Sequence, residues 1–181
     1  MSLMPAQSVE ASACGLGKVL RVATLNVDGC GAYKSSPPVR MGLMLDALTS
    51  LDLDAICFQE VVDEMNAVIC QRLRLHGWKV CRKKDRQEDY YLVTAVKTIS
   101  SNQDDKCISE VLPGSNNGRR LLIVRRGPWT IVNVHAKSGG RKREVQVRAR
   151  QLEFMSQIPS RLDKMQTYVL IGDFNLRVGE D

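Results

Sequence analysis

The chain has 181 residues, of which 44% are hydrophobic and 25% are charged, and its formal net charge is +6. This composition is typical of a globular protein and excludes disordered, collagen-like and disulfide-stapled chains, and the length predicts one domain. No apolar run approaches the roughly twenty residues that cross a bilayer, and residues 1–17 lack the pattern of a secretory signal. We therefore expect an intracellular protein with no membrane partner.

The cysteines favour the same location. No two of them form a C-x-x-C pair, which argues against a zinc site or a redox motif. Reduced thiols that serve as small apolar side chains are typical of the nucleus and cytoplasm, whereas disulfide frameworks are typical of secreted proteins. The six residues are Cys14, Cys30, Cys57, Cys70, Cys81 and Cys107.

The first half of the chain alternates between predicted strands and helices. We expect residues 1–17 to form a flexible N-terminal segment and the domain itself to span 18–181. Runs of β-branched and apolar residues predict strands, and apolar residues three or four apart predict helices. These patterns give a strand over 19–27, a helix from Ser36 to Leu51, a strand over 54–61, and a helix capped by Asp63 and ended by Gly77.

The second half begins with short extended runs. Gly127-Pro128 between two of them predicts a hairpin turn and therefore antiparallel pairing. The extended runs cover 78–82, 90–97, 120–126 and 130–136; a helical pattern follows over 141–158 and a buried strand over 168–172. Helices interspersed with crossover strands and hairpins predict a layered α/β sandwich.

Positive charge is concentrated between Arg119 and Arg150. This segment contains ten lysines and arginines and one acidic residue, Glu144, so its net charge is +9 and that of the remaining chain is −3. A basic segment attracts phosphate ligands, and it favours a nucleic acid over a neutral lipid headgroup. For 141–150 taken alone, a solvent-exposed helix face rich in arginine is the simpler interpretation.

Polar side chains gather where the apolar strands end. Burying such groups costs several kcal/mol unless each is paired or binds a ligand. Glu60 and Asp173 are hard oxygen ligands suited to Mg²⁺, which takes few protein carboxylates together with water and phosphate oxygens. The imidazole and the amides could hold phosphoryl oxygens while a carboxylate orients or deprotonates the attacking water. The polar residues are Asn26, Asp28, Gln59, Glu60, His135, Asp173 and Asn175.

Taken singly, these residues have simpler interpretations. Asp28-Gly29 is a common turn, and Glu60 at a strand end could pair with a basic side chain. Asp173 could cap a following helix, and His135 could be a hydrogen-bonded core imidazole. The joint pattern favours a site over these readings.

Four sequence motifs occur in a fixed order, each at the end of a predicted strand. They are LNVDG (25–29), FQEV (58–61), NVHAKSG (133–139) and GDFNLR (172–177). In order and separation they resemble the endonuclease/exonuclease/phosphatase superfamily, which implies its deoxyribonuclease-I-like fold, a four-layered α/β sandwich with mixed sheets. Within it the chain is most similar to the 5′-tyrosyl-DNA phosphodiesterases. Two positions depart from the pattern: Leu25, where many members have Trp, and Phe174, where the tyrosyl enzymes have Thr.

The resemblance implies a metal-dependent hydrolytic site. Glu60 would be the principal ligand of Mg²⁺, with Mn²⁺ as an alternative ion, and Asn26 would assist it. Asp173 would align or activate the attacking water, and Asn175 would bind both the phosphate and that water. His135 would contact nonbridging phosphate oxygens or the DNA backbone.

The resemblance also implies a substrate. Ser138 would act with the histidine on phosphate oxygens, Tyr90 and Arg119 would shape the leaving-group and phosphate side, and Arg177 would meet the DNA strand. For the complete form of the protein, the implied reaction is hydrolysis of phosphoester bonds in nucleic acid, at 5′-tyrosyl DNA ends, by in-line displacement at phosphorus. Other substrates of the superfamily are abasic or ordinary DNA, poly(A) RNA, phosphoinositides and sphingomyelin.

The chain ends at Asp181, before one motif of the superfamily. That motif is a later Asp-His pair in an S-D-H context, whose histidine stabilises the transition state, and this sequence does not contain it. We expect a fragment or an incomplete gene model truncated before its C-terminal strands, rather than a natural shortened relative. The strand over 168–172 would then have an unpaired edge that favours self-association.

Two other functions stay open at the sequence level. One is a catalytically silent fragment that binds nucleic acid or a partner through its basic face. The other is a phosphatase of the superfamily that acts on a different phosphoester. An in-frame S-D-H motif beyond codon 181 would favour the enzyme over the silent fragment.

Overall fold

The computed structural model describes residues 8–9, 19–31, 36–83, 89–98, 107–115, 119–162, 166–177 and 179. In chain order the elements are β1 (Ser8–Val9), β2 (Leu20–Asn26), α1 (Pro37–Thr49), β3 (Ala55–Val61), α2 (Asp63–Leu75), β4 (Trp78–Arg82), β5 (Tyr91–Lys97), β6 (Cys107–Val111), β7 (Arg120–Arg126), β8 (Trp129–His135), α3 (Lys142–Ser156), α4 (Ile158–Arg161) and β9 (Thr167–Asp173). Strands and helices alternate from β2 to α2, as the sequence patterns predict for the first half, and five strands then follow one another.

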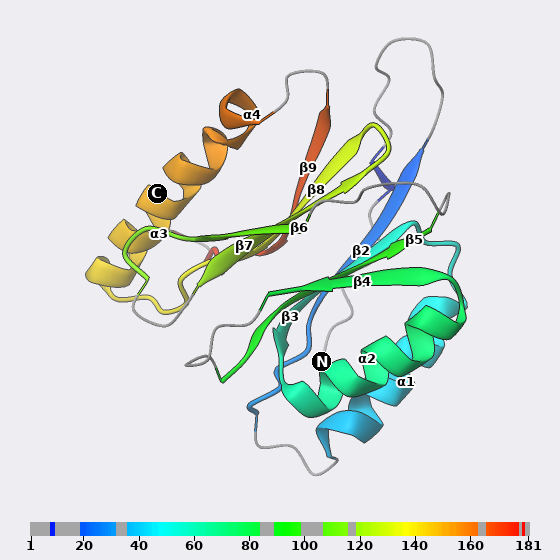
Figure 1. The fold of residues 1–181 in the computed structure, drawn as a ribbon. Helices are drawn as coiled ribbons and strands as arrows, with labels where there is room; N and C mark the ends of the chain where they lie inside the picture. Colours follow the sequence, from blue (N-terminus) through cyan, green and yellow to red (C-terminus); the bar gives the residue numbers. More distant parts are fainter. Residues whose placement is uncertain are drawn as a thin grey trace.

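Two mixed sheets pack face to face, and helices cover the outer face of each sheet (Figure 1). The first sheet has the strand order β1-β2-β3-β5-β4, and the second has the order β6-β7-β8-β9. The helices α1 and α2 lie on the first sheet, and α3 and α4 lie on the second. This arrangement confirms the predicted four-layered α/β sandwich with mixed sheets.

Three apolar layers join these four structural layers. Along β3, Ile56 and Phe58 face the helices of the first sheet, whereas Ala55 and Cys57 face the second sheet. A strand buried on both faces needs a continuous apolar run rather than an alternating one, which is why AICF is apolar throughout. The third layer packs the second sheet against α3 and includes Met155. No helix among the described residues is long and apolar enough to cross a membrane.

Proline and glycine in the sequence mark several of the element boundaries. The helix α1 begins with prolines at its first two positions, and Gly77, directly after the C-cap residue of α2, takes the left-handed backbone conformation with a φ of +74°. Gly127 also has a positive φ, +57°, in the turn between β7 and β8, which pair antiparallel as predicted.

Two predicted helix boundaries are wrong. Val62, not Asp63, is the N-cap of α2, and Asp63 is the first helical residue. The Asp63 carboxylate instead accepts a hydrogen bond of 2.9 Å from the Tyr91 hydroxyl, so it does not cap the helix. The predicted helix over 141–158 ends at Ser156, and a short helix with Pro159 near its start follows.

Two strands were not predicted. The strand β6 has the sequence CISEV, pairs antiparallel with β7, and buries none of its residues fully, so it lacks a strong apolar signal. The strand β1 falls inside the segment 1–17 that was expected to be flexible, and Ser8 and Val9 pair antiparallel with Arg21 and Leu20. The other residues of that segment lie outside the described residues.

Within the described residues, β9 forms an edge of the second sheet. It pairs in parallel with β8, and all seven residues of β8 are buried. None of the residues of β9 is fully buried, and Leu170 is 41% exposed. The self-association expected from this edge stays a prediction.

Some of the basic residues counted in the sequence are not on the surface. Arg119, Arg126 and Arg148 are each less than 10% exposed. Arg126 forms an ion pair of 2.9 Å with Asp54, and Arg148 is enclosed beneath the chain segment that follows β8. The basic surface is therefore smaller than the sequence count suggests.

Candidate active site

Glu60 lies in a bulge near the end of β3. The pairing of β3 with β5 is regular up to Phe58 and Val93, and the next pair is Val61 with Tyr91, so β3 carries one extra residue. Glu60 has a φ of +58°, in a region that residues other than glycine rarely adopt. In a regular strand its side chain would lie on the same face as Phe58, toward the helices. The bulge instead turns the carboxylate toward the edge of the sheets.

The turn after β2 packs closely against this bulge. The Gly29 amide donates a hydrogen bond of 2.9 Å to the Glu60 carbonyl. A Cβ atom at Gly29 would lie 2.3 Å from that carbonyl oxygen and 2.8 Å from Val62 Cγ1. A side chain at this position would therefore displace the backbone of Glu60.

Gly29→Ala is expected to destabilise the fold by about 2 kcal/mol, because the added methyl group overpacks backbone that cannot move freely. Gly42→Ala on α1 is the control, since the Cβ atom there meets only the end of the Arg72 side chain, at 3.2 Å. Alanine in a helix interior is favourable, so the control should be neutral or stabilising. Urea unfolding measures both, and equal midpoints for the two variants would contradict this packing.

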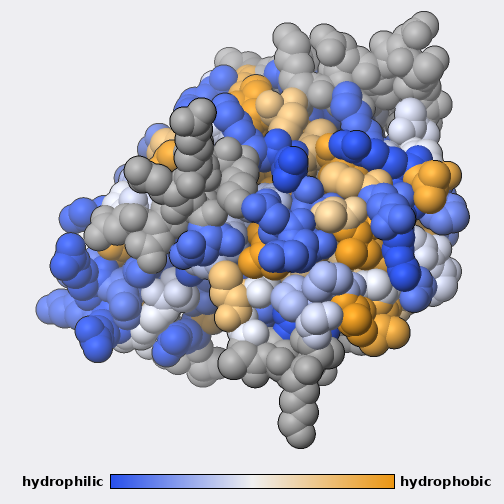
Figure 2. Space-filling model, turned by 60° about the horizontal axis from the view of Figure 1, so that its bottom comes forward, coloured by the Kyte–Doolittle hydropathy of each residue, from blue (hydrophilic) through white to orange (hydrophobic). Residues whose placement is uncertain are grey.

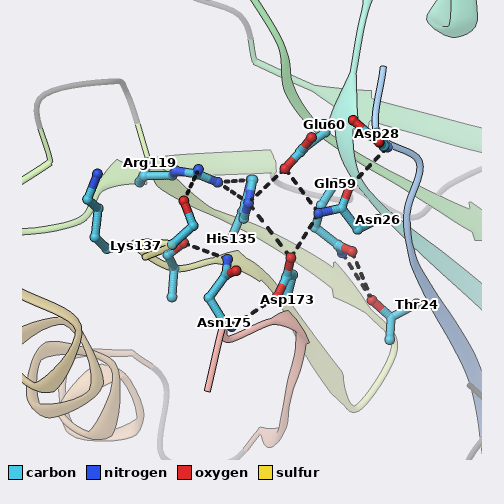
Figure 3. A network of polar contacts seen from close by, with 12 residues as sticks. Thr24, Asn26, Asp28, Gln59, Glu60, Arg119, His135, Lys137, Asp173 and Asn175 are labelled. Carbon is cyan, nitrogen blue, oxygen red and sulfur yellow. Dashed lines mark hydrogen bonds and ion pairs between the residues drawn. The ribbon is translucent and has the colours of Figure 1, made fainter. Parts of the chain in front are cut away.

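The carboxylates of Glu60 and Asp173 converge on one amide (Figure 3). Asn26 Nδ2 donates to Glu60 Oε1 at 3.1 Å and to Asp173 Oδ2 at 2.8 Å. Asn26 ends β2, which runs parallel to β3, and Asp173 ends β9, which runs parallel to β8. The ends of both parallel pairs thus meet at the same edge of the sandwich, although residues 26 and 173 are far apart in sequence.

Backbone contacts fix the orientation of these groups. Asn26 Oδ1 accepts a hydrogen bond of 3.0 Å from the Asp28 amide, so its NH₂ group faces the carboxylates. Asp173 Oδ1 accepts 2.9 Å from the Asn175 amide, and Asn175 Nδ2 donates to the Ala136 carbonyl at 3.1 Å. In this orientation Asn26 is a hydrogen-bond donor to both acids, and ligation of a metal by its oxygen would require the amide to turn over.

His135 occupies the centre of the site. Its Nε2 lies 3.4 Å from Glu60 Oε1 and 3.9 Å from Asp173 Oδ2, and the side chain is 3% exposed. Arg119 Nη1 lies 2.6 Å from His135 Nδ1 and also contacts Nε2. Burial, and then the Arg119 guanidinium, lower the pKa of His135 to about 3, against an opposing effect of Asp173. The imidazole is therefore neutral near neutral pH.

Two of the residues that the resemblance assigns to the substrate side, Tyr90 and Arg119, lie beside His135. The Tyr90 and His135 ring centroids are 5.7 Å apart, and Arg119 Cζ lies 5.4 Å from the Tyr90 ring centroid. Arg119 Nη2 also donates to Ser138 Oγ at 3.2 Å. Arg177 is exposed and lies against Gly140, in the segment that follows His135, rather than among the acids.

The donor set fits Mg²⁺. Two carboxylates point at one amide, and among the described residues neither is paired with a lysine or an arginine, so a divalent cation would supply the missing countercharge. No group of three or more His, Cys, Asp or Glu side chains in the described part of the chain is arranged to hold a metal ion. Mg²⁺ needs only one or two protein carboxylates, because water and substrate oxygens complete its shell.

A buried polar network behind the site was not predicted. Gln59 donates to Asn133 Oδ1 at 2.7 Å and to Thr24 Oγ1 at 3.0 Å, and Asn133 donates to Thr94 Oγ1 at 3.2 Å. The sequence contains one signal for it: Asn133 interrupts the apolar run of β8 and shares a face with His135, two residues later.

Sequence comparison assigns the chain to a family. The sequence pattern of the endonuclease/exonuclease/phosphatase family matches residues 23–181. The chain belongs to the endonuclease/exonuclease/phosphatase family. Its fold is a phosphoesterase fold of this family, and the four motifs of the sequence lie around the convergent site. No curated protein matches the chain by sequence.

Solved structures confirm the family fold. A truncated TDP2 of Caenorhabditis elegans is 22% identical, with a TM-score of 0.68, over 88% of this chain and 64% of that protein. A D. rerio TDP2 in complex with a single strand DNA product is 21% identical, with a TM-score of 0.66, over 89% and 62% of the two chains. A 3′ phosphatase of Neisseria, NExo, bound to a product DNA hairpin, is 20% identical, with a TM-score of 0.56, over 86% and 57%. The chain thus spans less than two thirds of each of these three structures.

Proposed function

We propose that this chain is the metal-dependent phosphodiesterase part of a family member that hydrolyses phosphoester bonds in nucleic acid, at 5′-tyrosyl DNA ends. The observation that carries the proposal is the convergence of Glu60, Asp173 and His135 on one edge of the sandwich, bridged by the Asn26 amide. A phosphate placed there would meet carboxylates, a neutral imidazole and an arginine within one small volume.

The chain's own residues would position the attacking water. Asp173 Oδ1 is held by the Asn175 amide and Oδ2 by Asn26, so this carboxylate has a fixed direction in which to orient the water and accept its proton. His135 is neutral and can donate to a phosphoryl oxygen. Glu60 would hold Mg²⁺ or Mn²⁺, and such an ion supplies a Lewis acid that neutralises charge developing on the phosphoryl group.

Two features support a nucleic acid as the substrate. Arg141, Lys142 and Arg143 at the start of α3 are exposed, and so is Arg177 beside the same segment. Hydrophilic side chains predominate on the α3 side of the face drawn in Figure 2. Such a basic strip next to the site would attract the phosphate backbone, and DNA products are bound by the D. rerio and Neisseria relatives.

The aromatic side of the site supports a tyrosyl leaving group. Arg119 lies over Tyr90 and reaches both His135 and Ser138, so one guanidinium links an aromatic surface to the phosphate side. A phenolic leaving group would stack against Tyr90 while its phosphate faces the acids. We place such an enzyme in the nucleus or cytoplasm.

The proposal is tested with the purified 181-residue chain and Mg²⁺ on matched phosphoesters. The substrates are a 5′-phosphotyrosyl oligonucleotide, an abasic oligonucleotide, poly(A) RNA and a soluble phosphoinositide. We expect the tyrosyl oligonucleotide to be hydrolysed fastest and EDTA to stop the reaction. Faster hydrolysis of another substrate would reassign the specificity. DNA binding that weakens steeply with salt but shows no turnover would support a silent binding unit instead.

A further inference from the structure

One buried amide joins the two sheets directly behind the site. Asn133 is on β8, in the second sheet, and is 0% exposed. Its Nδ2 donates to the Phe58 carbonyl at 3.2 Å, the Val93 carbonyl at 3.1 Å and Thr94 Oγ1 at 3.2 Å. Its Oδ1 accepts 2.7 Å from Gln59 Nε2. All four partners belong to the first sheet.

Asn133 is an amide among apolar residues of β8. Its neighbours Val132 and Val134 are apolar and buried, and an apolar residue at 133 would leave the Phe58 and Val93 carbonyls and the Gln59 amide without their partner. A buried amide whose donors and acceptor are all engaged does something that an apolar residue cannot, because it fixes the position of each group it bonds.

The groups that Asn133 holds define the start of the Glu60 bulge. Phe58 and Val93 form the last regular pair of β3 with β5 before the extra residue. Asn133 bonds the carbonyls of both, so it clamps the two strands together at the point where their pairing breaks. Through Gln59 it also holds the side chain of the residue that precedes Glu60.

The clamp links the two halves of the site. Glu60 keeps a left-handed backbone conformation that a glutamate adopts only where the surroundings impose it. His135 is two residues after Asn133 on the same strand, so both side chains face the first sheet. A single amide therefore ties the strand that carries Glu60 to the strand that carries His135.

We infer that Asn133 is a positioning residue that sets the bulge of β3 and thereby the place of the Glu60 carboxylate relative to His135 and Asp173. Its effect on metal affinity rests on the proposed function. Its effect on the bulge does not, because the contacts of Asn133 exist without any ligand. The two effects can therefore be measured separately.

The test compares Asn133→Leu with Thr130→Val in the full chain. Thr130 lies on the same strand, is also 0% exposed, and bonds Gln166 at the other end of β8, so it is the matched control. The first readout is amide hydrogen exchange of Gly29, which donates to the Glu60 carbonyl. The internal reference is the Asp54 amide, which donates to the Arg21 carbonyl before β3 begins.

In Asn133→Leu, exchange of the Gly29 amide should accelerate at least about tenfold relative to the Asp54 amide, as expected for local opening of the bulge. The second readout is Mn²⁺ affinity by electron paramagnetic resonance, which should weaken about tenfold or more, as for other outer-shell partners of metal ligands. Thr130→Val should change neither the ratio of Gly29 to Asp54 exchange nor the Mn²⁺ affinity. A purely structural role would lower global stability without moving the Mn²⁺ affinity of the folded fraction.

Several results would overturn the inference. Equal acceleration at Gly29 and Asp54, or unchanged exchange with unchanged Mn²⁺ affinity, would show that Asn133 does not position Glu60. If Asn133→Leu does not fold, Thr94→Val removes one of the four partners of Asn133, and it should accelerate Gly29 exchange by a smaller factor. Absence of that change would also contradict the inference. If the wild-type chain binds no Mn²⁺, the proposed function fails while the exchange ratio still decides this point.

Discussion

Glu60→Gln is expected to abolish the stabilisation of the chain by Mg²⁺. A ligand that binds only the folded state at 100 times its dissociation constant adds about 2.7 kcal/mol to the free energy of unfolding. The substitution keeps the size of the side chain and its hydrogen bond with Asn26, but it removes the charge that holds the cation. Thermal unfolding in Mg²⁺ and in EDTA should therefore differ for wild type and coincide for the variant.

Glu60→Gln should lose hydrolytic turnover together with metal binding. Charge stabilisation by a bound metal contributes several kcal/mol, so hydrolysis should drop about a thousandfold or more. Glu153→Gln, on the exposed face of α3, makes the same chemical change away from the site and should retain the full Mg²⁺ effect. A Glu60→Gln variant that Mg²⁺ stabilises as strongly as wild type would show that the cation binds elsewhere.

Arg148→Leu is expected to destabilise the fold by roughly 3 kcal/mol. Arg148 on α3 is 1% exposed, and its Nη1 donates to the Lys137 carbonyl at 2.6 Å and to the Gly139 carbonyl at 3.1 Å. Each hydrogen bond to a charged group contributes about 1.5–3 kcal/mol, and leucine would leave the carbonyls without these donors. The segment they belong to carries Ser138, so the site should loosen with it.

The matched control is Arg150→Leu, two residues along the same helix. Arg150 is exposed, and exposed substitutions usually change stability by less than about 0.5 kcal/mol. Urea unfolding of the two variants should separate them clearly. Equal midpoints would mean that Arg148 contributes charge rather than structure, as the sequence interpretation of a solvent-exposed arginine face assumed.

The sequence predicted that these polar residues meet at one edge because they follow strands. Asn26 and Asp173 come directly after apolar runs, and parallel strands bring their carboxyl ends to one edge. The residues assigned by resemblance to the substrate side, Tyr90 and Arg119, also lie beside His135.

The remaining features depend on contacts across the fold. Asn133 reads as one polar residue in an apolar strand, and its four partners belong to the opposite sheet. The sequence alone suggests that Arg148 is a surface charge, and only the folded segment after β8 shows that it is buried. The left-handed conformation of Glu60 comes from a bulge that is defined by pairing with β5. No local pattern in the sequence contains this information.

The most direct measurement of metal binding by Glu60 is the anomalous scattering of crystals of this chain soaked in Mn²⁺. We predict one strong peak bound by the Glu60 carboxylate, with Asp173 and Asn26 around the same ion or joined to it through one water. Glu60→Gln crystals should lack the peak. A peak bound to other side chains, with none at Glu60 in the wild-type crystal, would contradict a metal site formed by Glu60 and Asp173.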